Sequence, residues 1–535
     1  MLRYMTVVGA LCAGCAPFLS GGVPRPEADA AVIGISVGVV LTAALALGGR
    51  WSSRVAAVLG TGLAAVVWWL LVSDLLTGLT GDDLPVLAVG ASAVAVGAIG
   101  RASRGARIPL SPASTEEKQV SGRLGWRVRP GGVVAVVVVA VAAVVAPSAA
   151  DAVIVRSETR DARDFPAEPV AERPAGRQWV WQPPADVVDV VPAGHGVAVA
   201  SRDGSVVALN GVDGRVEWRY ARPGAPVGKL LASMDRRTVL VSYRSLHDTR
   251  AQSVVALDAD TGSPRFELVV RSVLVETGQL RPGTRMLTMR DGDTITGYDL
   301  VTGARQWAWS PPEGCTSRFG LPAWGRTTVL APLECPESLG VLALDEVSGR
   351  ERWRYEAPRD QRSDERQDVL LRATRDGAVV AVEMYGVRAE PGSVPNGLLD
   401  TETGRVLVRP ERPWTVRTDV GVMPLLEHQE NGGATEVHSL DPATGAITPL
   451  SVEACPARSA DTTTSTTYLR ACGDNGRELT VVTQSLDGSP PTATPVRLDG
   501  SGSRSDVHLV AAPGAIVLTR TAFGGTPSPV VGLVG

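Results

Sequence analysis

The sequence has few of the residues that build metal sites and covalent catalytic sites. It contains 6 cysteines, 5 histidines and only 4% aromatic residues among 535. No C-x-x-C-H run is present, because the CAGC segment at Cys12–Cys15 is followed by Ala16, and this excludes a c-type haem attachment. The histidines are scattered singly, so no Ser-His-Asp set or phosphate-binding loop can be named from spacing. No catalytic or metal-binding residue is predicted.

The chain also has no excess of positive charge. Its formal net charge is -4 and its estimated pI is 5.9. A nucleic-acid partner would be expected to require a basic surface, so that class of partner is not predicted.

Composition changes along the chain and predicts two structural units. Up to about residue 150 the sequence is dominated by Ala, Val, Leu and Gly, whereas afterwards Asp, Arg, Thr, Pro and Trp are frequent and apolar runs are short. A chain of 535 residues also exceeds the usual size of one hydrophobic core. We expect a helical membrane region at 1–150, an extracytoplasmic linker at 151–175 that forms a stiffened stalk, and a second domain at 176–535.

Apolar stretches in the first unit predict four to five membrane spans. Each is close to the ~20 residues of helix that cross a ~30 Å hydrocarbon core. The first and fourth are rich in small residues, and the third and fifth are the strongest. The predicted spans are about 4–20, 31–49, 55–73, 84–100 and 131–149.

Lys and Arg residues predict the orientation, because cationic loops stay in the cytoplasm. Arg3 precedes the first span, Arg50 and Arg54 lie between the second and third, and the segment 101–130 is strongly basic. The turn at 81–83 carries no basic residue. Five spans therefore place the N-terminus and the basic loop 101–130 in the cytoplasm and everything after residue 150 outside. One alternative interprets the first stretch as a signal sequence, and another allows cleavage after the fifth span.

A repeat of forty to fifty residues fills the second unit. The segments 206–220, 254–268, 295–309 and 341–355 align without gaps, and weaker copies follow at 397–408, 437–448 and 482–493. This period leaves room for four short strands per repeat and is typical of a β-propeller.

Each strong copy combines a turn residue, a glycine and an aromatic residue. An Asp can bond its own backbone to start the turn, and Gly supplies the positive φ that ends it. The aromatic residue four positions later is expected to pack against the neighbouring blade. We interpret all of them as structural rather than as ligands: Gly214, Trp218, Asp258, Gly262, Asp299, Gly303, Trp307, Asp345, Gly349 and Trp353.

The two ends of the repeat region complement each other. Residues 507–520 and 529–535 supply three strands without an aromatic outer strand, whereas GRQWVWQPP at 176–184 resembles an outer strand without its blade. Pairing them in one sheet removes the open edge. The fold class predicted is all-β, an eight-bladed β-propeller with seven blades as the alternative, preceded by the helical membrane region.

The motif A-L-D-x-x-T-G-x-x-x-W resembles the PQQ-binding-like repeats of the quinoprotein alcohol dehydrogenase-like superfamily. The resemblance covers about residues 176–535 and implies a propeller. In that superfamily, dehydrogenases hold pyrroloquinoline quinone (PQQ) and calcium in the central funnel, while other members are non-enzymatic scaffolds or sensors. Those dehydrogenases stack the quinone on a disulfide between adjacent cysteines, and this sequence contains no adjacent pair. No cofactor is therefore predicted, with PQQ and calcium as the alternative.

Four cysteines follow the blade pattern of the predicted propeller. Cys315 precedes the first strand of the fourth blade and Cys335 follows its second, and Cys455 and Cys472 take the equivalent places in the seventh. The start of one strand and the end of its antiparallel neighbour lie on one face, so the disulfides Cys315–Cys335 and Cys455–Cys472 are predicted. A zinc site is the alternative, but the spacings do not match metal knuckles.

These features together favour a non-enzymatic binding, scaffold or sensor module in a bacterial cell envelope. It would be a multi-pass protein of the plasma membrane with an extracellular propeller. Its expected partners are the lipid bilayer and an envelope protein, a polymer or a small ligand on the propeller face or in the funnel. A membrane-bound PQQ-dependent dehydrogenase is the alternative.

Overall fold

The protein, seen here as a computed structural model, separates into two compact units. One is formed chiefly by Met1–Arg156, and the other contains Ser157–Ala221, Pro226–Arg244 and Gln252–Gly535. The structure describes the whole chain apart from residues 20–25, 78, 80–81, 105–129, 164–166, 245–249, 318–320, 361–367, 386, 388–396, 410–413, 419, 430–434, 452–454, 456–457, 474–477, 499–506 and 522–525.

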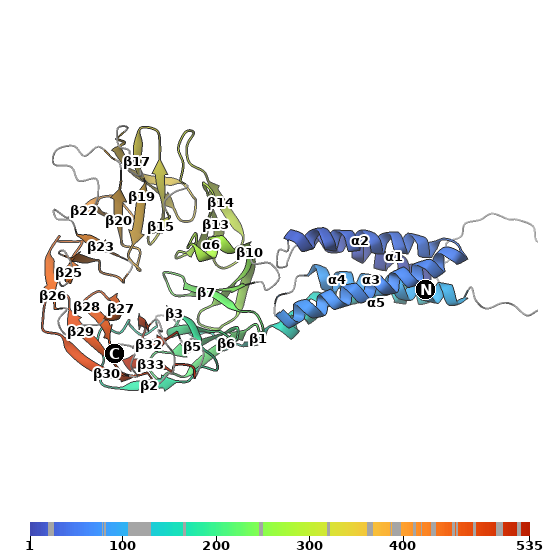
Figure 1. Cartoon of the computed structure of the whole chain (residues 1–535), viewed down its shortest axis with the longest axis horizontal. Coiled ribbons are helices and arrows are strands. Elements are labelled where there is room, and N and C mark those ends of the chain that lie inside the picture. Colours follow the sequence, from blue (N-terminus) through green and yellow to red (C-terminus); the bar gives the residue numbers. More distant parts are fainter. Residues whose placement is uncertain are drawn as a thin grey trace, which may run out of the picture. The chain divides into compact units, whose positions relative to one another are not determined.

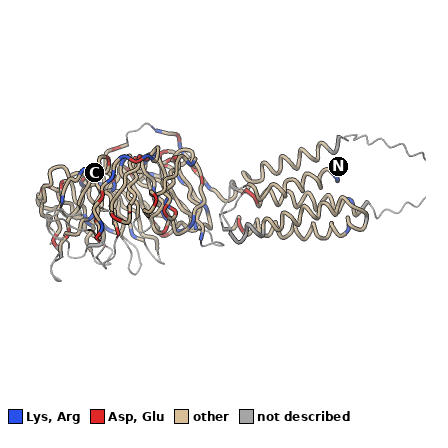
Figure 2. The backbone as a smooth tube through the Cα atoms, turned by 90° about the horizontal axis from the view of Figure 1, so that it is seen from above, with Lys and Arg blue, Asp and Glu red and all other residues tan. Residues whose placement is uncertain are grey.

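The first unit is helical (Figure 1). Its elements are α1 (Leu2–Cys15), the short 3-10 turn η1 (Ala16–Phe18), α2 (Pro26–Leu47), α3 (Arg50–Thr77), α4 (Asp83–Arg104) and α5 (Pro130–Ile154). Each predicted span overlaps one of the helices α1 to α5. Charged residues are sparse along the helices and frequent in the second unit (Figure 2).

Three helices in the described part of the chain are long and apolar enough to cross a membrane: Trp51–Leu76, Asp83–Ser103 and Val133–Ile154. Leu2–Phe18 and Val32–Leu47 are apolar but shorter. These lengths are compatible with a membrane-associated protein. Most of the predicted cytoplasmic loop 101–130 lies outside the described residues.

Small residues let α1 and α4 approach each other closely. A Cβ added to Gly9 would lie 2.7 Å from the carbonyl oxygen of Gly90, and one added to Gly90 would lie 2.8 Å from the carbonyl oxygen of Gly9. Close backbone approach through glycine is a common way to pack helices in lipid, where the hydrophobic effect between helices is weak.

The second unit is a ring of eight small antiparallel sheets, or blades (Figure 1). Blade 1 consists of β3 (Val187–Ala193), β4 (Gly196–Ser201), β5 (Ser205–Asn210) and β6 (Val216–Ala221). Blade 2 consists of β7 (Val227–Ala232), β8 (Thr238–Arg244), β9 (Ala251–Asp258) and β10 (Pro264–Arg271), followed by the short helix α6 (Ser272–Glu276). Blade 3 consists of β11 (Leu280–Pro282), β12 (Met286–Asp291), β13 (Thr294–Asp299) and β14 (Arg305–Trp309). Blade 4 consists of β15 (Ala323–Trp324), β16 (Thr328–Glu334), β17 (Ser338–Asp345) and β18 (Glu351–Pro358).

The remaining blades repeat this order from the axis outward. Blade 5 consists of β19 (Val369–Ala373), β20 (Val379–Met384), β21 (Gly397–Asp400) and β22 (Val406–Val408). Blade 6 consists of β23 (Thr415–Arg417), β24 (Leu425–Gln429), β25 (Thr435–Leu440) and β26 (Ile447–Leu450). Blade 7 consists of β27 (Arg458–Thr463), β28 (Thr467–Cys472), β29 (Glu478–Ser485) and β30 (Thr492–Arg497). Blade 8 consists of β31 (Val507–Ala512), β32 (Ala515–Arg520), β33 (Val530–Val534) and β2 (Gln178–Trp181).

Blade 8 joins the two ends of the propeller. Strand β2 pairs antiparallel with β33, with Gln178 opposite Leu533 and Trp181 opposite Val530. The predicted eight-bladed ring and its composite last blade are therefore confirmed, and seven blades are not observed.

The aromatic residue of each strong repeat packs onto the turn glycine of the next blade. The Trp307 indole nitrogen donates to the carbonyl of Glu346 at 2.9 Å, and its ring lies against Gly349, where an added Cβ would be 2.6 Å from Cδ2. The pairs that share this arrangement are Trp179–Gly214, Trp218–Gly262, Phe266–Gly303, Trp307–Gly349 and Trp353–Gly404. Each glycine has a positive φ, so the glycine is required both by the turn and by the indole or phenyl ring that covers it.

The linker differs from the predicted stalk. Residues 151–154 belong to α5, and β1 (Arg156–Glu158) adds a fifth strand to blade 1 beside β6. The backbone N–H of Arg160 donates to the carbonyl of Thr261, and that of Ala171 donates to the carbonyl of Ala512. The described part of the linker after β1 is therefore bound to the propeller, because its backbone and its charges find partners there.

Replacing Gly349 tests the contact between blades. Gly349→Ala should destabilise the propeller by about 2 to 4 kcal/mol, because it adds backbone strain and a clash with Trp307. Gly292→Ala is the control, since Gly292 has a similar φ of 62° and no atom within 4 Å of the added Cβ. Denaturant unfolding should show a larger loss for Gly349→Ala. Equal losses for the two variants would show that the indole contact contributes nothing.

Candidate functional site

A central cavity runs through the axis of the propeller. Its volume is about 960 Å³. Its wall comes from the first strands of blades 1 to 5, 7 and 8, from turns after first strands, including Gly421 and Val422 of blade 6, and from Val170 and Glu172 of the linker. We call the face that carries the turns between first and second strands the turn face. Because the first strands converge on the axis from positions hundreds of residues apart, any ligand in this cavity would contact several blades at once.

Most charged groups around the cavity are paired. The Arg417 guanidinium lies 3.0 Å from Asp461 and 2.8 Å from Glu427. Burial by itself would lower the pKa of Arg417, but the hydrogen bonds that it donates to Asp461 and Glu427 outweigh this effect and raise the pKa. Arg326 lies 2.6 Å from Asp376 at the turn face. The Arg417 pair joins blades 6 and 7, and the Arg326 pair joins the turns of blades 4 and 5, so these charges are neutralised by their partners.

Asp189 lies in the cavity wall of blade 1, beside His508 of blade 8. Its carboxylate oxygen is 3.9 Å from Nδ1 of His508. Burial raises the pKa of Asp189, while His508 and Lys229 act in the opposite direction. The His508 ring also shares a 2.7 Å hydrogen bond with Thr521, the residue that follows the second strand of its own blade.

Two arginines differ from the paired ones. Arg281 in β11 lies over the ring of Trp324, with its guanidinium carbon 5.9 Å from the ring centroid. Arg236 lies in the turn after β7. Within the residues that the structure describes, neither side chain forms an ion pair with a carboxylate, and burial lowers the pKa of both guanidinium groups.

A strap from the linker crosses part of the turn face. Val170 pairs with Pro513 as an isolated bridge, and Ala171 is buried against blades 7 and 8. Glu172 enters the cavity wall, where its carboxylate accepts hydrogen bonds from Thr464, from Ser465 at 2.8 Å and from Thr466 at 2.9 Å. Burial opposes ionisation of Glu172, but these hydroxyl donors outweigh it and lower its pKa.

A second group of charges binds the start of the linker to the turn face. Arg160 forms ion pairs with Glu217 and, at 3.3 Å, with Asp260. The His195 ring lies 3.3 Å from the same oxygen of Asp260. Burial lowers the pKa of His195, while Asp260 raises it and Arg160 lowers it. The two acids and the Arg160 side chain are largely buried, so this cluster is a structural clamp.

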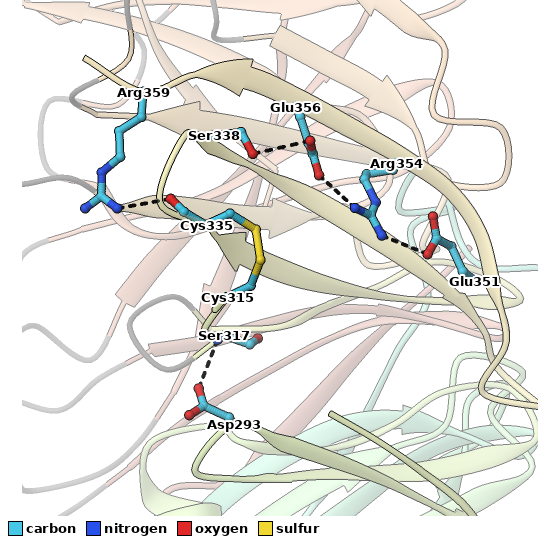
Figure 3. Close-up of a disulfide and its surroundings, with 9 residues drawn as sticks. All are labelled: Asp293, Cys315, Ser317, Cys335, Ser338, Glu351, Arg354, Glu356 and Arg359. Carbon is cyan, nitrogen blue, oxygen red and sulfur yellow. Dashed lines mark hydrogen bonds and ion pairs between the residues drawn. A yellow bond between two sulfur atoms is a disulfide. The ribbon is translucent and has the colours of Figure 1, made fainter. Parts of the chain in front are cut away.

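The four cysteines of the propeller form two disulfides in the structure. Cys315 is joined to Cys335 with a Cα–Cα distance of 4.2 Å, and Cys455 to Cys472 with 5.3 Å. Figure 3 shows the first of them, where the Arg359 guanidinium donates to the Cys335 carbonyl at 3.1 Å. Both bridges lie at the ends of second strands, on the face opposite the turn face and away from the strap.

The repeat residues lie in the turns and between the blades. Asp258 accepts hydrogen bonds from the backbone N–H groups of Asp260 and Thr261, as the turn interpretation requires. Burial opposes ionisation of Asp258, but these bonds lower its pKa. The repeat aspartates are therefore occupied by their own turns. Among the described residues, no group of three or more His, Cys, Asp or Glu side chains could hold a metal ion.

Sequence reasoning missed the residues that distinguish the cavity: Glu172, Arg236 and Arg281. Of these three, only Arg236 could have been recognised from the sequence. Blade 5 has the turn Thr374-Arg375-Asp376-Gly377, with a φ of 65° at the glycine, and blade 2 has Ser233-Met234-Asp235-Arg236, with a φ of 62° at Arg236. An arginine at a position that favours glycine was visible in the sequence once the two turns were aligned.

Removing the Glu172 carboxylate tests the strap. Glu172→Ala should lower the unfolding free energy by on the order of 1 to 2 kcal/mol at pH 7, because three hydroxyl donors lose a charged acceptor that is only partly screened by solvent. The pKa of folded Glu172 is lowered, so its contribution is present at neutral pH and is lost as the pH falls below the ordinary value of 4.5. Thermal unfolding at pH 7 and pH 4 measures both effects. Glu168→Ala is the control, since Glu168 is exposed, and an equal loss in that variant would contradict the proposed anchoring.

Comparison with known proteins agrees with the fold. A family model described as "Outer membrane protein assembly factor BamB" matches residues 223–448. No curated protein matches the sequence. Similar solved structures include BamB from Moraxella catarrhalis (17% identity, 67% of this chain and 100% of that chain, TM-score 0.38) and the dihydro-heme d1 dehydrogenase NirN in complex with DHE (15%, 58% and 67%, TM-score 0.35).

A computationally designed protein, Ika8, is also similar (13% identity, 66% of this chain and 98% of that chain, TM-score 0.39). An assembly factor, a dehydrogenase and a designed protein share no function, and at these identities and TM-scores the likenesses carry no functional argument. The chain is an eight-bladed β-propeller with apolar N-terminal helices, and residues 223–448 of the propeller are similar to the repeats of that family.

Proposed function

We propose that the chain is a membrane-anchored binding module, in which the helices hold a non-enzymatic propeller outside the cytoplasm. The observation that carries the proposal is the central cavity. It is a large space of about 960 Å³ inside a closed ring, with both charged and apolar groups in its wall. A rigid concave site of this kind suits recognition of a ligand or of a partner's protruding segment.

The matching family is described as an outer membrane protein assembly factor. That description supports an envelope protein as one partner, beside a polymer or a small ligand. The two disulfides support a location outside the cytoplasm, since such bonds persist in oxidising compartments. The basic residues near the helix ends support a cytoplasmic N-terminus, and the five apolar helices support a multi-pass arrangement.

The residues around the cavity do not fit a quinone held by calcium. Asp376 and Asp461 are paired with arginines, and Glu172 is bound by hydroxyl groups. Calcium prefers six to eight oxygen ligands, and these carboxylates are dispersed over different blades. We therefore propose a module without a redox cofactor, with a PQQ-dependent dehydrogenase as the alternative that the tests below address.

Reporter fusions test the topology. A reporter that is active only outside the cytoplasm should be active when fused after Gly535 and inactive when inserted between Pro112 and Ala113, in the basic segment. The opposite reporter, fluorescent only in the cytosol, should give the reverse pattern. Cytosolic fluorescence from the fusion after Gly535 would contradict the proposal that the propeller lies outside the cytoplasm.

Redox turnover tests the alternative function. The purified full chain, incubated with PQQ and calcium, should not reduce an artificial electron acceptor in the presence of alcohols or sugars at a rate above that of the quinone alone. Turnover is the readout because the quinone carries carboxylates and could bind a cationic cavity without any chemistry. Sustained reduction of the acceptor would show that the chain is a dehydrogenase and would contradict the proposed non-enzymatic function.

A further inference from the structure

We propose that the cavity binds a small organic anion, a carboxylate or a phosphate on an apolar body, through Arg281 and Arg236. This inference rests on the proposed binding function and specifies the class of ligand.

Arg281 is placed so that its charge faces the cavity. In β11, Leu280 and Pro282 are buried, while Arg281 between them is exposed and lines the cavity. Its guanidinium lies over Trp324, a contact that holds the group in place without neutralising it. Within the described residues, the guanidinium makes no interaction other than this contact with the indole.

Arg236 occupies a backbone conformation that an arginine rarely adopts. It is the one non-glycine residue with a positive φ in the described part of the chain. The turn is otherwise the same as that of blade 5: the Ser233 hydroxyl donates to Asp235 at 2.6 Å as Thr374 does to Asp376 at 2.8 Å, and the N–H of Arg236 donates to the Ser233 carbonyl at 2.8 Å. Glycine would fit this position without backbone strain. The strain that the arginine causes therefore indicates that its side chain has a role.

The two arginines lie on adjoining segments. The N–H of Met234 donates to the carbonyl of Gly283 at 2.9 Å, which joins the turn of Arg236 to the chain just after Arg281. The acidic group near Arg236 is Asp235, whose carboxylate accepts the Ser233 hydroxyl and the N–H of Arg237.

The arginines of the next three blades differ from Arg281 and Arg236. Arg372, Arg326 and Arg417 each have a carboxylate within about 3 Å. Among the described residues, no carboxylate lies this close to Arg281 or Arg236, although desolvation of an unpaired guanidinium is unfavourable. A bound anion would supply the missing partner.

The ligand class follows from the groups beside the arginines. The planar guanidinium donates two parallel hydrogen bonds and is suited to carboxylate and phosphate oxygens. Leu321, Pro322, Trp324 and Met234 line the same cavity and offer apolar contact. The volume of 960 Å³ is within the range that holds a compact organic molecule.

Calorimetric titration of the full chain in detergent tests the proposal with three probes of similar shape: benzoate, phenyl phosphate and the neutral benzamide. Either anion should bind saturably, and benzamide should bind at least tenfold more weakly. The stronger of the two anions assigns the ligand to carboxylates or to phosphates. Binding of benzamide as tight as that of the better anion would overturn the proposal, as would a lack of binding by both anions.

Two variants locate the site. Arg281→Gln and Arg236→Gly should each weaken binding of the better anion at least tenfold. Arg236→Gly creates the turn already present in blade 5, so it should fold at least as well as the original chain. Arg326→Gln is the control, because Arg326 is already paired with Asp376, and its affinity should be unchanged.

Unchanged affinity in both Arg281→Gln and Arg236→Gly would refute the assignment. That result would leave the proposed function standing, since reporter topology and redox turnover are measured independently. Conversely, a dehydrogenase activity or a cytosolic propeller would remove the proposed function while the anion affinity was still measurable.

Discussion

The pairing of β2 with β33 is the contact on which the propeller depends. A chain of small sheets has two open edges, and each unpaired edge exposes backbone donors and acceptors. Here the first strand of the repeat region becomes the outer strand of the last blade. Trp179 of that strand then packs onto Gly214 and donates to the carbonyl of Gly211 at 2.7 Å, so the last blade contacts the first as the other blades contact each other.

Closure also determines the chemistry at the axis. A cavity wall drawn from all eight blades holds its shape only if no blade can rotate away from its neighbour. The indole and phenyl rings that cover the turn glycines provide this restraint at the periphery, far from the axis. The inner strands can then carry charged side chains toward the cavity, such as that of Arg281.

The linker shows how a tertiary contact overrides local composition. Pro-rich sequence with alternating charges is typical of an extended spacer, yet Arg160 and Glu172 find their partners on blades 1, 2 and 7, at Glu217, Asp260 and Thr464. The strap therefore belongs to the propeller, and Glu172 becomes part of the cavity wall. Nothing in the linker's own composition indicates that those partners lie on one face.

The amino-acid sequence by itself determined the helices, the eight blades, the composite last blade and the position of the turn glycines. These features are local or periodic. An apolar run forms a helix, a strand followed by Asp and Gly forms a turn, and an aromatic residue at a constant distance after the Gly packs between blades. The pairing of cysteines could also be proposed, because the blade pattern places each pair on one face.

Only the tertiary structure decided where the linker binds, which aromatic ring covers which glycine, and which arginines around the axis lack a carboxylate. Neutralisation of a charge depends on distances of a few ångströms between residues that are tens to hundreds of positions apart. Arg326 and Arg281 look alike in the sequence, and one is paired with Asp376 while the other faces the cavity over Trp324. The physical reason is that the repeated residues specify the blades and their packing. The chemistry of the cavity depends instead on wall residues that are not part of the repeat.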